Sequence, residues 1–121
     1  MRWNCDIKGC RLQHRFDPGV LDGCLPRGSS FGALDAWVEI GGRFLFIEHK
    51  GVGVPLDGGQ GPALKRLARQ PDCTVWLVRD YPPAGKVIRY EWRDMATHEP
   101  FSVITFDHFR GMVALWGSLG T

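Results

Sequence analysis

The Gly41-Gly42 pair, placed between two β-rich runs, constrains the fold of this 121-residue chain more than any other feature. Residues 34–40 precede the pair and residues 43–50 follow it, and both runs are rich in aromatic and β-branched side chains. A two-residue turn between antiparallel strands requires positive φ angles, which glycine adopts without steric cost. The sequence therefore predicts a tight β-hairpin over these residues.

The register of this hairpin places two acidic residues next to each other. A two-residue turn puts Asp35 opposite Glu48 and Trp37 opposite Phe46, whereas a three-residue loop would separate the two acids. Directly opposed side chains have Cβ atoms about 5 Å apart, so two like charges there destabilise the sheet. A divalent cation held by both carboxylates would remove that penalty. Asp35 and Glu48 are therefore candidate metal ligands, and the alternative is an ordinary solvated strand end.

Side chains on a strand alternate between the two faces of a sheet, which sorts the residues around Glu48. Glu48 and Lys50 share a face with Phe44 and Phe46, and His49 points the other way. We therefore expect only the backbone of His49 to lie at the site. Both faces of the hairpin carry apolar residues, so we expect both to be covered, as in an α/β core.

A helix is predicted after the hairpin, over residues 60–70, with Pro62 in its first turn, where proline is tolerated. Gln60, Leu64 and Leu67 fall on one face of this helix. A polar amide in line with a buried stripe, at the helix start, is expected to point back towards the strand that ends at Lys50.

The opposite face of this helix carries the basic residues Lys65, Arg66 and Arg69. One interpretation is an ordinary solvated face. The other is contact with a nucleic-acid backbone, where cations supply affinity without sequence preference. The net charge of +2 is compatible with a local basic patch but does not by itself indicate nucleic-acid binding.

The rest of the chain completes an α/β pattern. Residues 74–80 read as a buried strand, which a helical crossover would place parallel to the second hairpin strand. Residues 81–85 contain two prolines and read as a loop, and residues 86–92 alternate as a further strand, placed at an edge. Thr105 would cap a last helix over residues 106–116, whose apolar stripe packs into the core or against a second copy.

The predicted fold is α/β, with a mixed central β-sheet flanked by helices in a single domain over residues 1–121. Its core spans about residues 30–94, after a cysteine-containing segment at 1–29 and before a C-terminal helix at about 105–118. No apolar run approaches 18 residues and the N-terminus lacks the apolar stretch of a signal peptide. We therefore expect no membrane span and a cytoplasmic protein.

Four residues of the N-terminal segment have side chains of the type that binds zinc, namely Cys5, Cys10, His14 and Cys24. Four such ligands would suffice for a structural Zn²⁺ site. The spacing contains no CxxC pair, so the alternative is that the cysteines are reduced thiols. A disulfide is not expected without a secretory context.

Several motifs resemble the PD-(D/E)xK nuclease superfamily, and in particular its small phage, VRR-NUC-like and Holliday-junction-resolvase-like members. The resemblance covers about residues 3 to 80. The motifs are Asp35, Glu48-His49-Lys50 at the end of a strand, Gly59-Gln60 at a helix start, Trp3-Asn4-Cys5 and Cys24-Leu25-Pro26. The resemblance implies a restriction-endonuclease-like core and a metal-dependent phosphodiesterase.

The resemblance also implies roles for individual residues. Asp35 and Glu48 would bind Mg²⁺ or Mn²⁺ together with the main-chain carbonyl of His49. Lys50 would act on the attacking water and the developing phosphate charge, and Gln60 would orient Lys50 or that water. The substrate would be duplex or branched DNA in a bacterial host cell, in phage, mobile-element or repair processes. A homodimer is compatible with this group of proteins.

Two alternatives stay open at this stage. The chain could be a non-catalytic nucleic-acid-binding or inhibitor protein built on the same fold. It could also be a structural domain in which Asp35 and Lys50 form an ion pair.

Overall fold

The computed structural model describes residues 23, 26, 34–56 and 58–119. Residues Leu34–Thr121 form a compact unit, which contains the five strands and the two helices α2 and α3. The possible zinc ligands Cys5, Cys10, His14 and Cys24 lie outside the described residues. The single-domain organisation therefore stays a prediction.

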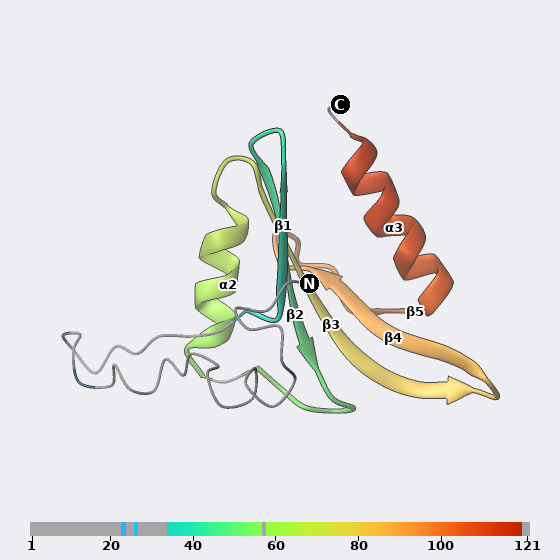
Figure 1. The fold of residues 1–121 in the computed structure, drawn as a ribbon. Coiled ribbons are helices and arrows are strands. Elements are labelled where there is room, and N and C mark those ends of the chain that lie inside the picture. The colour runs from blue at the N-terminus through green and yellow to red at the C-terminus, as the bar shows by residue number, and fades with distance from the viewer. Residues whose placement is uncertain (1–22, 24–25, 27–33, 57, 120–121) are drawn as a thin grey trace, which may run out of the picture. The chain divides into compact units, whose positions relative to one another are not determined.

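The larger unit is built on one five-stranded sheet (Figure 1). The strands lie in the order in which they occur in the chain, and only β2 and β3 are parallel neighbours. The strands are β1 (Ala36–Ile40), β2 (Arg43–Lys50), β3 (Cys73–Ala84), β4 (Val87–Asp94) and β5 (Ser102–Thr105). The helices are α2 (Gln60–Ala68), which joins β2 to β3, and α3 (Phe106–Ser118). The predicted α/β fold, with a mixed central sheet flanked by helices, is confirmed.

The β1–β2 hairpin has the register that the Gly-Gly turn predicts. Gly41 and Gly42 have φ angles of 60° and 84°, and Ile40 pairs with Arg43 across the turn. Trp37 lies opposite Phe46. The parallel pairing of β2 with β3 is also as expected for a helical crossover between them.

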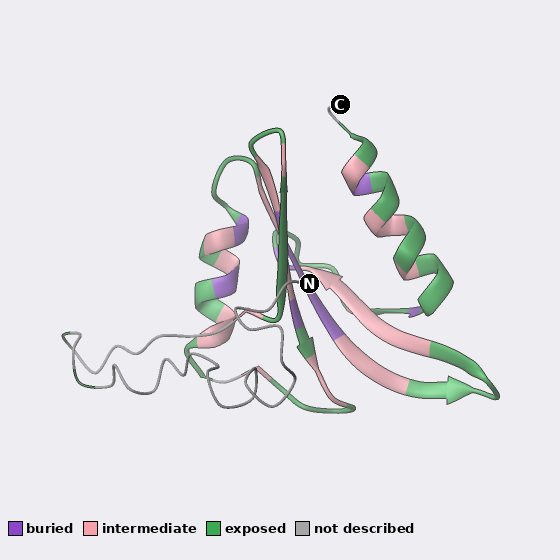
Figure 2. Cartoon of the chain, in the orientation of Figure 1, coloured by how far each residue is buried: buried purple, intermediate pink, exposed green. Residues whose placement is uncertain are grey.

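The side chains of β3 point alternately to the two faces of the sheet. On one face, Val75 and Leu77 pack with Leu64 and Ala68 of α2, and Met95 joins this cluster. Figure 2 shows how the buried residues concentrate in the middle of the sheet and on the facing side of each helix. A strand covered on both faces has a continuous apolar sequence, which is what β3 presents.

The other face of the sheet is covered by α3. Trp116 of α3 is buried with Leu45 and Trp76, and its Nε1–H donates to the Thr74 Oγ1 at 3.3 Å. The Arg43 guanidinium lies over the Trp116 ring, 4.5 Å from its centroid. These contacts hold the C-terminal helix on the sheet, so the apolar stripe of α3 belongs to the core. The helix begins with the predicted cap, because the Thr105 side chain accepts a hydrogen bond from the His108 N–H.

Two expectations about the C-terminal half are wrong. Residues 81–85 do not form a loop, because β3 continues to Ala84 and the turn is at Gly85-Lys86. Nor is β4 an edge strand, because the four-residue strand β5 pairs with it. None of the helices among residues 34–56 and 58–119 is both long and apolar enough to cross a membrane.

Candidate active site

Glu48 is a buried carboxylate near the end of β2. Its exposed fraction is only 4%, and it is the one buried charged side chain among the described residues. Its Oε2 atom has no hydrogen-bond partner in the described part of the protein. Burying a carboxylate oxygen without a donor destabilises the folded state, so packing alone does not account for Glu48.

Lys50 and Gln60 lie beside this carboxylate. The Lys50 Nζ is 3.5 Å from the Glu48 Oε1, and the lysine side chain remains partly accessible. Gln60 is the first residue of α2, and its side chain lies close enough to the Glu48 carboxyl group to act on the pKa of that acid. The Gln60 Oε1 is itself buried and without a partner among the described residues. Two acceptor oxygens without donors therefore lie in one small region.

Asp35 comes directly before β1 and completes the group. Ala36 pairs with Ile47, so the register carried one residue further places Asp35 opposite Glu48. The Asp35 Oδ2 accepts a hydrogen bond of 2.7 Å from the main-chain N–H of His49. The structure thus brings together Asp35, Glu48, Lys50 and Gln60, which sequence analysis selected as site residues.

The electrostatic environment favours the protonated form of Glu48. Burial raises the pKa of the Glu48 carboxyl group, and the negative charge of Asp35 raises it further. The Gln60 side chain and the Lys50 charge act in the opposite direction without cancelling the rise in pKa. A divalent cation at this point would favour the ionised carboxylate instead.

Lys50 does not form the ion pair with Asp35 that the purely structural alternative required. In the described part of the chain its salt-bridge partner is Glu48. The Asp35 carboxylate instead accepts the His49 amide. This arrangement leaves the lysine ammonium between solvent and the buried acid.

The side chain of His49 lies on the opposite face of the sheet, as the alternation predicted. Its Nε2 is 2.8 Å from the Asp80 Oδ1, and both side chains are about half exposed. Sequence analysis missed this pair because it depends on the β2–β3 register. Alternation within a strand identifies a face but does not reveal which residue of a parallel neighbour lies alongside.

The basic residues of α2 are not gathered at the site. Lys65, Arg66 and the C-cap residue Arg69 follow Gln60 by five to nine positions, which is about 8 to 14 Å along a helix. Arg66 and Arg69 are exposed and Lys65 is partly buried. Any contact that they make with nucleic acid would therefore lie to one side of the four clustered residues.

The donor set has the chemistry of a Mg²⁺ or Mn²⁺ site. Two carboxylates, an amide oxygen and backbone carbonyls are hard oxygen ligands, and Mg²⁺ commonly uses one or two carboxylates together with waters. Among residues 34–56 and 58–119, no three His, Cys, Asp or Glu side chains converge to hold a metal by themselves. A cation here would therefore need backbone, amide or water oxygens in addition to Asp35 and Glu48.

Comparison with models of known protein families finds no match to this chain, and searches of curated proteins and of solved structures find none either.

Proposed function

We propose that this protein is a metal-dependent nuclease that hydrolyses phosphodiester bonds of DNA. The observation that carries the proposal is the buried Glu48, which has an unpartnered oxygen and a second carboxylate beside it. This arrangement costs stability in the folded domain, and a bound cation would compensate for that cost.

Asp35 and Glu48 would hold Mg²⁺ or Mn²⁺, with the main-chain carbonyl of His49 as a third ligand. When bound, such a cation polarises a phosphate oxygen and lowers the pKa of a coordinated water. The carboxylate of Asp35 is oriented for this role by the His49 N–H, which fixes one of its oxygens at 2.7 Å.

Lys50 and Gln60 have complementary roles in the proposal. The Lys50 ammonium is partly exposed and 3.5 Å from Glu48, so it can reach a phosphate placed beside that acid. There it would stabilise the negative charge that develops on the phosphate. The Gln60 amide would orient the attacking water or Lys50, because its oxygen is free to accept a hydrogen bond.

The wider setting also belongs to the proposal. The substrate would be duplex or branched DNA, and Lys65, Arg66 and Arg69 would contact its backbone. The protein would act in the cytoplasm of a bacterial host cell, as a phage, mobile-element or repair nuclease, alone or as a homodimer. A non-catalytic nucleic-acid-binding or inhibitor protein is the alternative that the experiment below separates from an enzyme.

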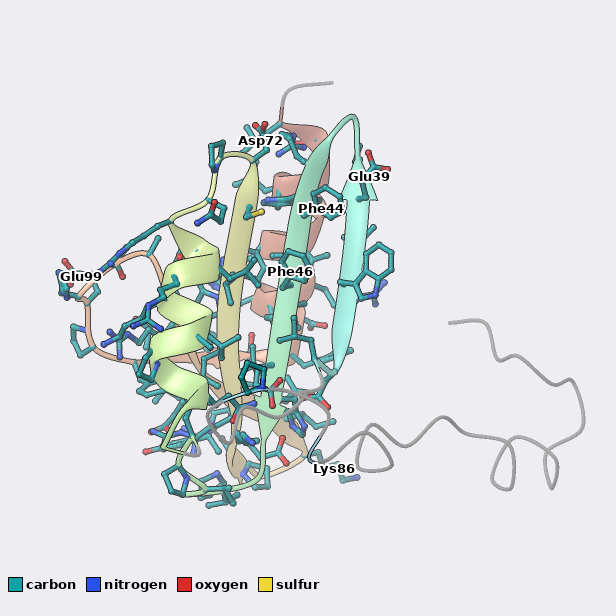
Figure 3. The ribbon with its side chains drawn as sticks, turned by 90° about the vertical axis from the view of Figure 1, so that its left-hand side faces the viewer. Glu39, Phe44, Phe46, Asp72, Lys86 and Glu99 are labelled. Carbon is teal, nitrogen blue, oxygen red and sulfur yellow. The ribbon has the colours of Figure 1, made fainter. Side chains whose placement is uncertain are left out.

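A cleavage panel tests the proposal. The full chain is incubated with labelled duplex, single-stranded and branched DNA in Mg²⁺, Mn²⁺ or EDTA, and Mn²⁺ binding is measured in parallel by calorimetry. We expect cleavage that requires the metal and is abolished in Glu48→Gln and Lys50→Met. Glu39→Gln is the matched control, because Glu39 lies on the same hairpin at the other end of the sheet (Figure 3).

The outcomes separate the candidate functions. Absence of Mn²⁺ heat, or equal heat in Glu48→Gln and the natural protein, would overturn the metal site. Metal binding and DNA binding without cleavage of any substrate would indicate the non-catalytic alternative.

A further inference from the structure

The β3–β4 hairpin extends well beyond the end of β2. Lys50, the last residue of β2, pairs with Arg79, and β3 continues from there to Ala84. Five further residues correspond to at most about 17 Å of extended chain. Figure 1 shows this hairpin running past the end of β2, and Figure 2 shows that its far end is exposed. We refer to residues 81–90 as the arm.

The arm has a defined shape because internal contacts fix it. Tyr81 pairs with Arg89 and Ala84 pairs with Val87, so two prolines on one strand face Ile88 alone. Such a bulge bends a hairpin and suits prolines, which cannot donate to the ladder. The Arg89 Nε and Nη2 both donate to the Pro82 carbonyl oxygen, at 3.0 and 2.8 Å. The Arg89 guanidinium also lies over the Tyr81 ring, 5.0 Å from its centroid.

The far end of the arm combines positive charge with exposed apolar side chains. Lys86 and Arg89 are its cations, and residues 81–90 contain no acid. At the base of the arm the charges are paired, since Arg79 contacts Glu91 at 2.9 Å. Val87 and Ile88 are 48% and 55% exposed. Neither side chain belongs to the two apolar clusters of the core, and the proposed chemistry does not involve them.

The arm and the candidate active site lie at the same end of the sheet. In Figure 3, Lys86 lies towards the end where β2 finishes and α2 begins, away from Glu39 and Asp72. Lys50 ends β2 and Gln60 begins α2, so both belong to that end. A long polyanion bound at the site would therefore be able to reach the arm.

We propose that the arm binds a groove of duplex DNA next to the candidate active site, with Lys86 at the phosphates and Val87 and Ile88 against the sugars and bases. This inference rests on the proposed function for its substrate. A two-stranded ribbon fits a DNA groove, and apolar side chains at its tip are suited to pressing between base steps. Single strands are bound by exposed aromatic platforms. The two tyrosines of the arm are at its base and already have partners, because the Arg89 guanidinium lies over the Tyr81 ring and Tyr90 contacts Phe109 of α3.

The test measures binding in EDTA, so that it does not depend on metal or cleavage. Fluorescence anisotropy follows a labelled duplex and the matching single strand at several salt concentrations, with the full chain. The arm variants are Lys86→Ala and the double variant Val87→Ser with Ile88→Ser. Arg110→Ala and Val103→Ser are the controls, because Arg110 is an exposed cation on α3 and Val103 is 48% exposed on β5.

We expect Lys86→Ala to weaken duplex binding about threefold or more and to reduce the salt slope by about one. The double variant should weaken duplex binding about tenfold and single-strand binding by less than about twofold. The controls should bind as the natural protein does, and thermal unfolding should confirm that all variants are folded.

Three results would overturn the proposal. The first is duplex binding unchanged in both arm variants. The second is equal loss for duplex and single strand in the double variant. The third is a dimer that the double variant converts to monomer while duplex binding is unchanged, which would make the tip a protein contact.

Mn²⁺ calorimetry on the arm variants distinguishes this proposal from the proposed function. If the arm variants bind Mn²⁺ with the same heat as the natural protein and bind duplex DNA equally well, only the role of the arm is rejected. Weakened duplex binding in the arm variants, with no Mn²⁺ heat even in the natural protein, would reject the metal site alone.

Discussion

The Asp35 carboxylate accepts a hydrogen bond from the main-chain N–H of His49, with 2.7 Å between the Oδ2 and the nitrogen. This bond holds Asp35, which precedes β1, beside His49, and therefore close to the buried Glu48. Glu39 makes a similar bond at the other end of the hairpin, where its Oε2 accepts the Gly42 N–H, also at 2.7 Å. The two exposed acids therefore make the same kind of structural bond, but only Asp35 adjoins a second carboxylate.

This similarity allows stability to be separated from function. We expect Glu39→Ala to lower the free energy of unfolding by about 1 kcal/mol, because it removes one hydrogen bond to the backbone. Asp35→Ala removes the same kind of bond but also relieves the repulsion between Asp35 and Glu48, so without metal it should cost no more than Glu39→Ala. Only Asp35→Ala should also lose Mn²⁺ heat and DNA cleavage. Urea unfolding and calorimetry measure the two properties. Mn²⁺ binding that survives in Asp35→Ala would exclude this residue as a ligand.

The raised pKa of Glu48 predicts a specific pH dependence of stability. Since the folded protein holds the Glu48 proton to higher pH than the unfolded chain does, stability falls as pH rises between the two pKa values. Glu48→Gln has no charge to bury, so in EDTA it should become more stable than the natural protein as pH rises through that window. Thermal unfolding of both proteins between about pH 4 and pH 8 measures this. If the stability difference between the natural protein and Glu48→Gln does not change with pH, the pKa of Glu48 is not raised in the folded state.

Bound metal should reverse the difference in stability between the natural protein and Glu48→Gln. A ligand that binds only the folded state stabilises it by about 2.7 kcal/mol at 100 times its dissociation constant. Saturating Mn²⁺ at pH 7 should therefore raise the melting temperature of the natural protein and leave that of Glu48→Gln nearly unchanged. Glu39→Gln should respond as the natural protein does. An equal rise in all three proteins would indicate binding elsewhere.

The parts of the fold that could be predicted are those set by local sequence. The Gly41-Gly42 turn and the period-two alternation of β2 fix which residues face each other, so the grouping of Asp35 with Glu48 followed from the sequence. The pairing of strands that are distant in sequence could not be predicted from local sequence. The strand β5 has only four residues and is defined by its pairing with β4.

Other features depend on partners that are distant in sequence. Pro82 and Pro83 predicted a loop, because proline cannot donate a hydrogen bond to a neighbouring strand. In the structure the Arg89 side chain donates to the Pro82 carbonyl oxygen, and a bulge places the two prolines opposite one residue of β4, so the pairing of β3 with β4 continues. The burial of Glu48 and its unpartnered oxygen depend on how α2 and β3 pack around it. Sequence alternation indicated the face of Glu48 but not how much water reaches it.

Trp116 should be the main attachment of α3 to the sheet. Its side chain is buried against Leu45 and Trp76, and its Nε1–H reaches Thr74. We expect Trp116→Ala to lower the free energy of unfolding by about 3–5 kcal/mol through the cavity it leaves. Leu115→Ala is the control, because Leu115 is 61% exposed and its loss should change stability by less than about 0.5 kcal/mol. Urea unfolding of both variants measures the difference, and equal losses would contradict this packing.

The Arg89 guanidinium should control the rigidity of the arm rather than the stability of the core. Arg89→Lys keeps the charge, but an ammonium cannot reproduce the paired bonds of the guanidinium to the Pro82 carbonyl together with its stacking over Tyr81. We expect faster amide hydrogen exchange in residues 84–90, unchanged exchange in β2, and a loss of less than about 1 kcal/mol in the free energy of unfolding. Arg110→Lys, on α3, is the charge-matched control and should leave exchange in the arm as it is. If exchange in the arm is the same in Arg89→Lys and the natural protein, the turn and the bulge alone hold its shape.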